Sequence, residues 1–65
     1  KLVGNSIYFQ GVEATTGNYY VYDLIGQLVQ KGKIAPQVSF YQKSGVYLIS
    51  VESSAGLKTK RVFKH

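Results

Sequence analysis

Apolar and polar side chains alternate along most of this chain in short stretches. A period of two is typical of strands with one buried face, and hardly any window shows the i, i+3, i+4 spacing of a helix. The apolar positions are mainly β-branched or aromatic, and Gly, Asn and Ser interrupt them about every 8–12 residues. The pattern therefore predicts an all-β fold, either a sandwich or a barrel.

The residue pattern in the first half of the chain predicts two hairpins. Residues 2–3 and 7–9 form the arms of one hairpin, or a single interrupted strand. After a turn at residues 15–18, residues 18–23 form a strand, with Tyr19 and Val21 on one face and Tyr20 and Tyr22 on the other. Residues 27–31 return as its partner, and a Lys-Gly-Lys sequence is expected to end that second strand.

Two turns in the chain have recognisable signatures. Asp23 can accept hydrogen bonds from the backbone ahead of it, and Gly26 can take a positive φ without a Cβ clash. Gly45 follows Lys43 and Ser44 in a second turn, where we also expect a positive φ. These residues are therefore predicted to fix the hairpins.

The second half contains the clearest strand. Residues 46–52 place Tyr47, Ile49 and Val51 on one face and Leu48, Ser50 and Glu52 on the other. A Val-x-Phe pattern at residues 38–40 predicts a short strand before it, which faces one side. The central strand should therefore supply much of the core.

The chain ends in a hairpin whose second strand has two mixed faces. Residues 53–56, including Gly56, form the turn that leads into a strand over residues 57–63. One face would carry Lys58, Lys60, Val62 and Lys64, and the other Leu57, Thr59, Arg61 and Phe63. Because neither set is purely apolar, we expect either a β-bulge or a solvent-exposed edge there.

Composition fits one small globular domain of 65 residues, 45% hydrophobic and 17% charged. The absence of Cys excludes disulfides and thiolate metal sites, and one His with three acids argues against any other metal site. The chain begins with Lys1 and no signal peptide, so we expect a piece of a longer protein. Residues 5–11 resemble a protease-site remnant but lack its first glutamate, so we treat them as native.

Catalysis is not expected of this chain. His65 is the terminal residue, Asp23 belongs to a turn and Glu52 ends a strand, so no nucleophile–base pair or carboxylate pair is evident. The seven glycines match neither dinucleotide-binding nor phosphate-loop spacing. We therefore predict a non-enzyme without a cofactor.

The net charge of +5 is unevenly distributed. The first thirty residues carry one lysine against two acids, and the remainder carries seven cations against one acid. A basic half can bind nucleic acid, an anionic membrane surface or an acidic protein, or it can form a solvated face that protects an edge strand. We favour the solvated face.

A nucleic-acid-binding small β-barrel is an alternative function. Exposed aromatic rings beside a basic groove can stack single-stranded bases. The candidates are Tyr8, Tyr20, Tyr22 and Tyr41 with Lys31, Lys33, Lys58, Lys60 and Arg61. Tyr is also an ordinary strand residue that covers a small core, so we favour the structural role and expect no nucleic-acid partner.

Two motifs resemble a known family. The sequence VYDLIGQLV at residues 21–29, SGVYLISV at residues 44–51 and the Lys-rich last strand after Gly56 are similar to the type A C-terminal sorting domain of the type IX, or Por, secretion system of Bacteroidota. The match covers residues 18–65 well and residues 1–17 loosely. The Tyr-Pro-Asn-Pro opening of the family is missing, so either the chain starts after it or this is a shorter variant.

The resemblance implies an Ig-like antiparallel β-sandwich at the C-terminus of a large secreted protein. Such domains carry their cargo from the periplasm through the outer-membrane translocon to the cell surface or the medium, and a sortase-type cysteine peptidase usually removes them. Many cargos are then attached to anionic lipopolysaccharide. By position, the motif residues are Asp23, Gly26, Gly45, Tyr47, Gly56, Lys58, Lys60 and Lys64.

A terminal edge strand is compatible with this role, because its unpaired backbone groups allow docking by strand addition while its lysines discourage indiscriminate pairing. The same edges would also permit a dimer. A further alternative is a carbohydrate-binding or structural Ig-like appendage of a surface enzyme, in which exposed Tyr rings stack on sugars.

Overall fold

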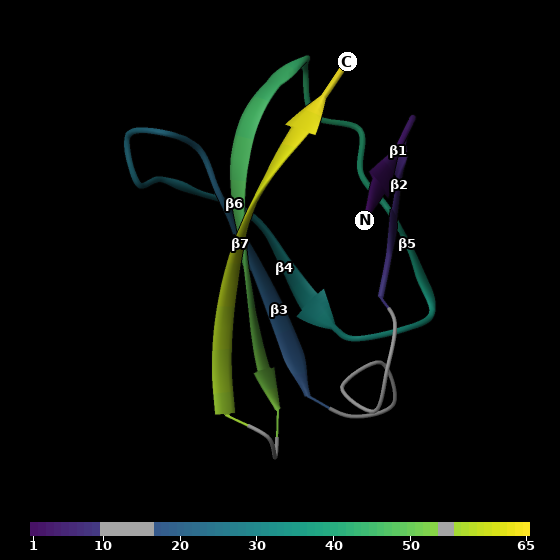
Figure 1. Ribbon diagram of the computed structural model, residues 1–65, viewed down its shortest axis with the longest axis vertical. Helices are drawn as coiled ribbons and strands as arrows, with labels where there is room; N and C mark the ends of the chain where they lie inside the picture. Colours follow the sequence, from purple (N-terminus) through teal and green to yellow (C-terminus); the bar gives the residue numbers. More distant parts are fainter. Residues whose placement is uncertain (10–16, 54–55) are drawn as a thin grey trace.

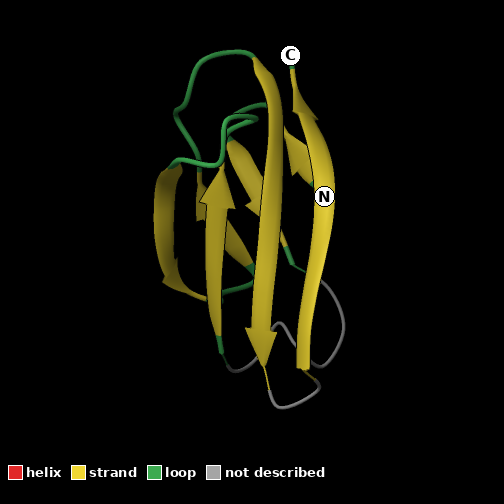
Figure 2. Ribbon diagram, turned by 90° about the vertical axis from the view of Figure 1, so that its left-hand side faces the viewer, coloured by secondary structure: helices red, strands yellow, loops and turns green. Residues whose placement is uncertain are grey.

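Two antiparallel sheets pack face to face in the computed structural model, which describes residues 1–9, 17–53 and 56–65 (Figures 1 and 2). The first sheet has the order β1-β2-β5 and the second the order β4-β3-β6-β7. The strands are β1 (Leu2–Val3), β2 (Ser6–Tyr8), β3 (Asn18–Tyr22), β4 (Leu28–Lys33), β5 (Gln37–Ser39), β6 (Gly45–Ser53) and β7 (Gly56–Lys64). The expected all-β antiparallel sandwich is confirmed.

The core lies between the sheets and follows the predicted alternation. Tyr19 and Val21 of β3 and Tyr47 and Ile49 of β6 are buried against Ile7 of β2. Phe40, directly after β5, and Ile34, directly after β4, complete the buried cluster. In both central strands the buried residues are therefore ones that alternation had placed on a common face.

The N-terminal hairpin is confirmed, because Leu2 pairs with Ile7 and Val3 with Ser6. The first two residues of the turn predicted at residues 15–18 lie outside the described residues, and its third residue, Gly17, has φ +112. The two central residues of the turn predicted at residues 53–56 also lie outside them.

Strand β4 ends at Lys33, the last residue of the Lys-Gly-Lys sequence expected to end it, and so extends two residues beyond the expected boundary at Lys31. Within this sequence Gly32 pairs with Tyr19 and Lys33 with Asn18. A Cβ on Gly32 would lie 3.1 Å from Cε1 of the Tyr19 ring. This glycine therefore makes room for a neighbouring aromatic ring inside the strand.

Strand β7 is an edge of the larger sheet. It pairs with β6 in one continuous register from Gly45 opposite Lys64 to Ser53 opposite Gly56. Of the two alternatives for the last strand, the exposed edge is confirmed, and the β-bulge is absent from this register. Gly45 is the first residue of β6, although it was expected in the turn; its expected positive φ is confirmed at +154.

The two sheets differ greatly in length, and this difference positions the candidate site. The strands of the first sheet have two or three residues, whereas β6 and β7 have nine residues each. On β7 the residues before Val62 are exposed, and burial begins only at Val62 and Lys64. The described part of the first sheet therefore leaves the beginning of β7 uncovered.

Candidate functional site

The turn between β3 and β4 is built by Asp23, as predicted. Its Oδ1 atom accepts hydrogen bonds from the backbone N–H of Ile25 at 3.1 Å and of Gln27 at 2.9 Å. The N–H of Gly26 donates to the Asp23 carbonyl at 3.1 Å, and Gly26 has φ +87. Both residues therefore hold the hairpin in shape.

Gly45, Tyr47 and Lys64 meet at one end of the larger sheet, around Phe40. The Tyr47 ring packs edge-on against Phe40 at 5.1 Å between centroids, and its hydroxyl donates to the Lys43 carbonyl at 2.6 Å. Gly45 lies opposite Lys64 in the β6–β7 register. This cluster closes the sandwich where the chain enters β6.

The burial of Lys64 corrects the expectation that the lysines of the basic half form a solvated face. Its side chain is buried, and its Nζ donates to the Phe40 carbonyl at 2.6 Å and lies 5.3 Å from the centroid of the Phe40 ring. A buried ammonium needs such partners because desolvation is costly. Lys64 therefore has a structural role in this fold.

Lys58 and Lys60 lie on the other half of β7, in a different environment. They are exposed, and they stand opposite Val51 and Ile49, whose side chains contribute to the core side of β6. Gly56, at φ +108, begins the strand beside them. Apart from Asp23 and Gly26 in the β3–β4 turn, the predicted residues thus divide into two groups at opposite ends of β7.

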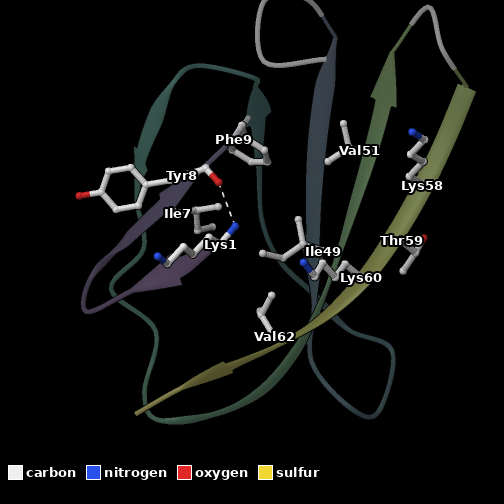
Figure 3. Close-up of a pocket in the computed structure, with 10 residues that line it drawn as sticks. All are labelled: Lys1, Ile7, Tyr8, Phe9, Ile49, Val51, Lys58, Thr59, Lys60 and Val62. Atoms are coloured by element: carbon white, nitrogen blue, oxygen red, sulfur yellow. Dashed lines mark hydrogen bonds between the residues drawn. The ribbon is translucent and has the colours of Figure 1, made fainter. Parts of the chain in front are cut away.

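A hollow of about 430 Å³ lies beside β7, between the two sheets (Figure 3). We call it the β7 groove. Its described lining is Lys1, Ile7, Tyr8, Phe9, Ile49, Val51, Lys58, Thr59, Lys60 and Val62. The aliphatic side chains form its apolar floor, the three lysines supply positive charge, and the Tyr8 ring points away from it.

The groove is bounded by two strand edges. β1 and β7 approach each other, yet they belong to different sheets and are not paired. The α-amino nitrogen of Lys1 donates to the Tyr8 carbonyl at 2.9 Å, and the Tyr8 N–H donates to the Lys1 carbonyl at 2.7 Å. These two hydrogen bonds hold the N-terminal side of the groove in place. Burial, and secondarily the charge of Lys60, lowers the pKa of the Lys1 α-amino group below its ordinary value of 8.0.

The outer face of the larger sheet carries the other perturbed group. The Tyr20 hydroxyl donates to Oε1 of Glu52 at 3.4 Å. The negative charge of Glu52 raises the pKa of Tyr20 above 10.0, because it disfavours the phenolate. The pair links β3 to β6 on the solvent side.

The residues proposed for nucleic-acid binding are divided between separate surfaces. Tyr20 lies beside Lys31 on the larger sheet, and Tyr8 belongs to the smaller sheet. Lys58 and Lys60 line the β7 groove on the core side, and Tyr41 follows β5. Of the four rings, Tyr8 alone lines a groove with Lys58 and Lys60 among the described residues, and its ring points away from that groove, which argues against this alternative.

The described residues include no group of three or more His, Cys, Asp or Glu side chains that would hold a metal ion. They also contain no helix of the length and apolarity needed to cross a membrane. Comparison with known proteins finds no family model, curated protein or solved structure that matches this chain.

Proposed function

We propose that this chain is a non-catalytic sorting domain that directs a cargo protein through a type IX outer-membrane translocon. The observation that carries the proposal is the placement of the terminal strand, since β7 is the edge of the larger sheet and is exposed over its first six residues. The motifs at residues 21–29 and 44–51 support it further. Residues 44–51 include most of β6, which pairs with β7, and residues 21–29 contain the turn between β3 and β4 in the same sheet.

The proposed mechanism is docking followed by removal. On an edge strand every second residue turns its N–H and C=O away from its sheet neighbour, where a receptor strand can pair with them. The translocon would recognise β7 in this way and deliver the cargo from the periplasm to the cell surface or the medium. A sortase-type cysteine peptidase would then remove the domain and attach the cargo to anionic lipopolysaccharide.

A secretion assay tests the proposal. Residues 1–65 are fused to the C-terminus of a periplasm-directed fluorescent protein, in a type IX-competent strain and in its translocon-deficient sibling. We expect fluorescence at the surface or in the medium of the competent strain alone. A second fusion that ends before Leu57 lacks most of β7 and should remain in the periplasm.

Two results would contradict the sorting role. The first is periplasmic retention of the intact fusion in both strains, also when its natural upstream segment is included. The second is normal secretion of the fusion that ends before Leu57. Immunoblots of periplasmic and extracellular fractions distinguish retention from degradation in either case.

A further inference from the structure

The core-side face of β7 is cationic at its beginning and apolar further along the strand. Lys58 and Lys60 are exposed there, whereas Val62 packs against the core cluster. Alternation along a strand puts these three side chains on one face, and all three line the β7 groove. The strand thus presents two cations and then an apolar side chain toward the same hollow (Figure 3).

The outward face of the same strand has a different sequence. Thr59, which also contributes to the groove lining, and Arg61 alternate with Lys58, Lys60 and Val62. Ser50 Oγ and Thr59 Oγ1 are hydrogen-bonded at 2.8 Å. An added strand opposite residues 58–62 would therefore meet Lys58, Lys60 and Val62 on one face and Thr59 and Arg61 on the other.

We propose that the β7 groove binds an extended, antiparallel segment of a partner protein whose groove-facing side chains are acidic beside Lys58 and Lys60 and apolar beside Val62. This inference rests on the proposed function and specifies the chemistry of the receptor segment. Backbone hydrogen bonds to the β7 edge supply affinity, and the alternating side chains supply specificity. Every strand pair in the two described sheets is antiparallel, which sets the orientation.

Charge complementarity and the open edge together favour a peptide strand over a small amphiphile. Three lysines line the hollow, so an anionic occupant is favoured. The edge lies directly beside this charge and offers backbone hydrogen bonds that a single acyl chain does not satisfy. A segment of a few residues buries little area, which is appropriate for a signal that must be released after transport.

The test uses the full 65-residue chain labelled with ¹⁵N and the peptide acetyl-Val-Thr-Glu-Thr-Glu-amide. In the antiparallel register its valine lies opposite Val62 and its glutamates lie opposite Lys60 and Lys58. We expect saturable amide shifts along residues 57–62 in a titration up to about 5 mM peptide, the range in which weak binding is measurable. The binding should weaken at high salt.

Two variants with the same change of charge distinguish the effect of a cation in the groove on binding from the effect of the net charge. Lys60→Glu reverses a cation in the groove and should weaken binding about tenfold, because attraction becomes repulsion. Arg61→Glu makes the same change on the adjacent, outward-facing position and should change binding about twofold or less. A peptide with Lys in place of its first Glu should recover binding to Lys60→Glu.

Three results would overturn the inference. The first is the absence of amide shifts along residues 57–62 in the peptide titration. The second is an equal loss of peptide binding in Lys60→Glu and Arg61→Glu. The third is a shift of the Ile7 and Ile49 methyl resonances on addition of decanoate when the peptide has no effect. The last result would identify an amphiphile site. Secretion of the wild-type fusion without peptide binding would overturn this inference alone, whereas peptide binding without secretion would overturn the sorting role alone.

Discussion

Gly17 and Gly56 have nearly the same backbone conformation, with φ of +112 and +108, but different surroundings. A Cβ on Gly17 would overlap the Glu52 carbonyl oxygen and lie 3.1 Å from Ser53 Cα, whereas a Cβ on Gly56 would meet nothing within 4 Å. We expect Gly56→Ala to lower the free energy of unfolding by about 1–2 kcal/mol through backbone strain alone. Gly17→Ala adds overpacking and should cost about 2–5 kcal/mol. Urea denaturation checks this difference, and equal losses would contradict it.

The Tyr20–Glu52 pair predicts a change in stability at high pH. Because the folded pKa of Tyr20 is raised, the neutral phenol stabilises the fold fully below the unfolded value of 10.0. This contribution is lost as the pH rises through the raised folded pKa. Glu52→Gln removes the charge and should lower the Tyr20 pKa toward 10.0. The measurement is phenolate absorbance during a pH titration, in which Tyr20→Phe identifies the transition that belongs to Tyr20. An unchanged Tyr20 pKa in Glu52→Gln would disprove that Glu52 raises it.

At the scale of strands, alternation was sufficient to predict β3 and β6 and the residues that share each face, because a period of two is a local property of the sequence. It also placed Lys58, Lys60 and Lys64 on one face of β7. Which end of that face is buried depends on the short strands of the first sheet and on Phe40, 24 residues away from Lys64. The groove and the buried lysine therefore could not be predicted from local pattern. The pairing of Gly32 inside β4 could not be predicted either, because this glycine makes room for the ring of Tyr19 in a neighbouring strand.

Lys64 is predicted to anchor the end of β7. Lys64→Met keeps an unbranched apolar side chain but removes the ammonium that donates to the Phe40 carbonyl. We expect the free energy of unfolding to fall by about 1–3 kcal/mol, the usual effect of losing a charged hydrogen bond to a buried group. Lys60→Met, on the same face of the same strand but exposed, should change it by about 0.5 kcal/mol or less. Denaturation curves of both variants measure the difference; indistinguishable curves would exclude this anchoring role.

At the scale of the whole molecule, positive charge and edge exposure have opposite effects on self-association. The larger sheet has one edge at β4 and another at β7. Four of the cations lie on β7, namely Lys58, Lys60, Arg61 and Lys64. Two copies that joined their β7 edges would bring these charges together, and the net charge of +5 would add a general repulsion. Since strand addition requires the same edge to be available, the charge has to suppress self-association without covering the backbone.

This balance predicts how the chain self-associates. The wild-type chain should be monomeric at low ionic strength, and association should increase with salt as the repulsion is screened. Replacing Lys60 and Arg61 together with Thr should produce dimers at low salt, because the β7 edge then lacks its central charges. Lys31→Thr with Lys33→Thr removes the same charge from β4 at the opposite edge, and this variant should remain monomeric. Sedimentation velocity distinguishes the two. Equal dimerisation of both variants would mean that net charge governs association, whereas dimers of the β7 variant alone would show that this strand's lysine and arginine keep its edge available for a chosen partner.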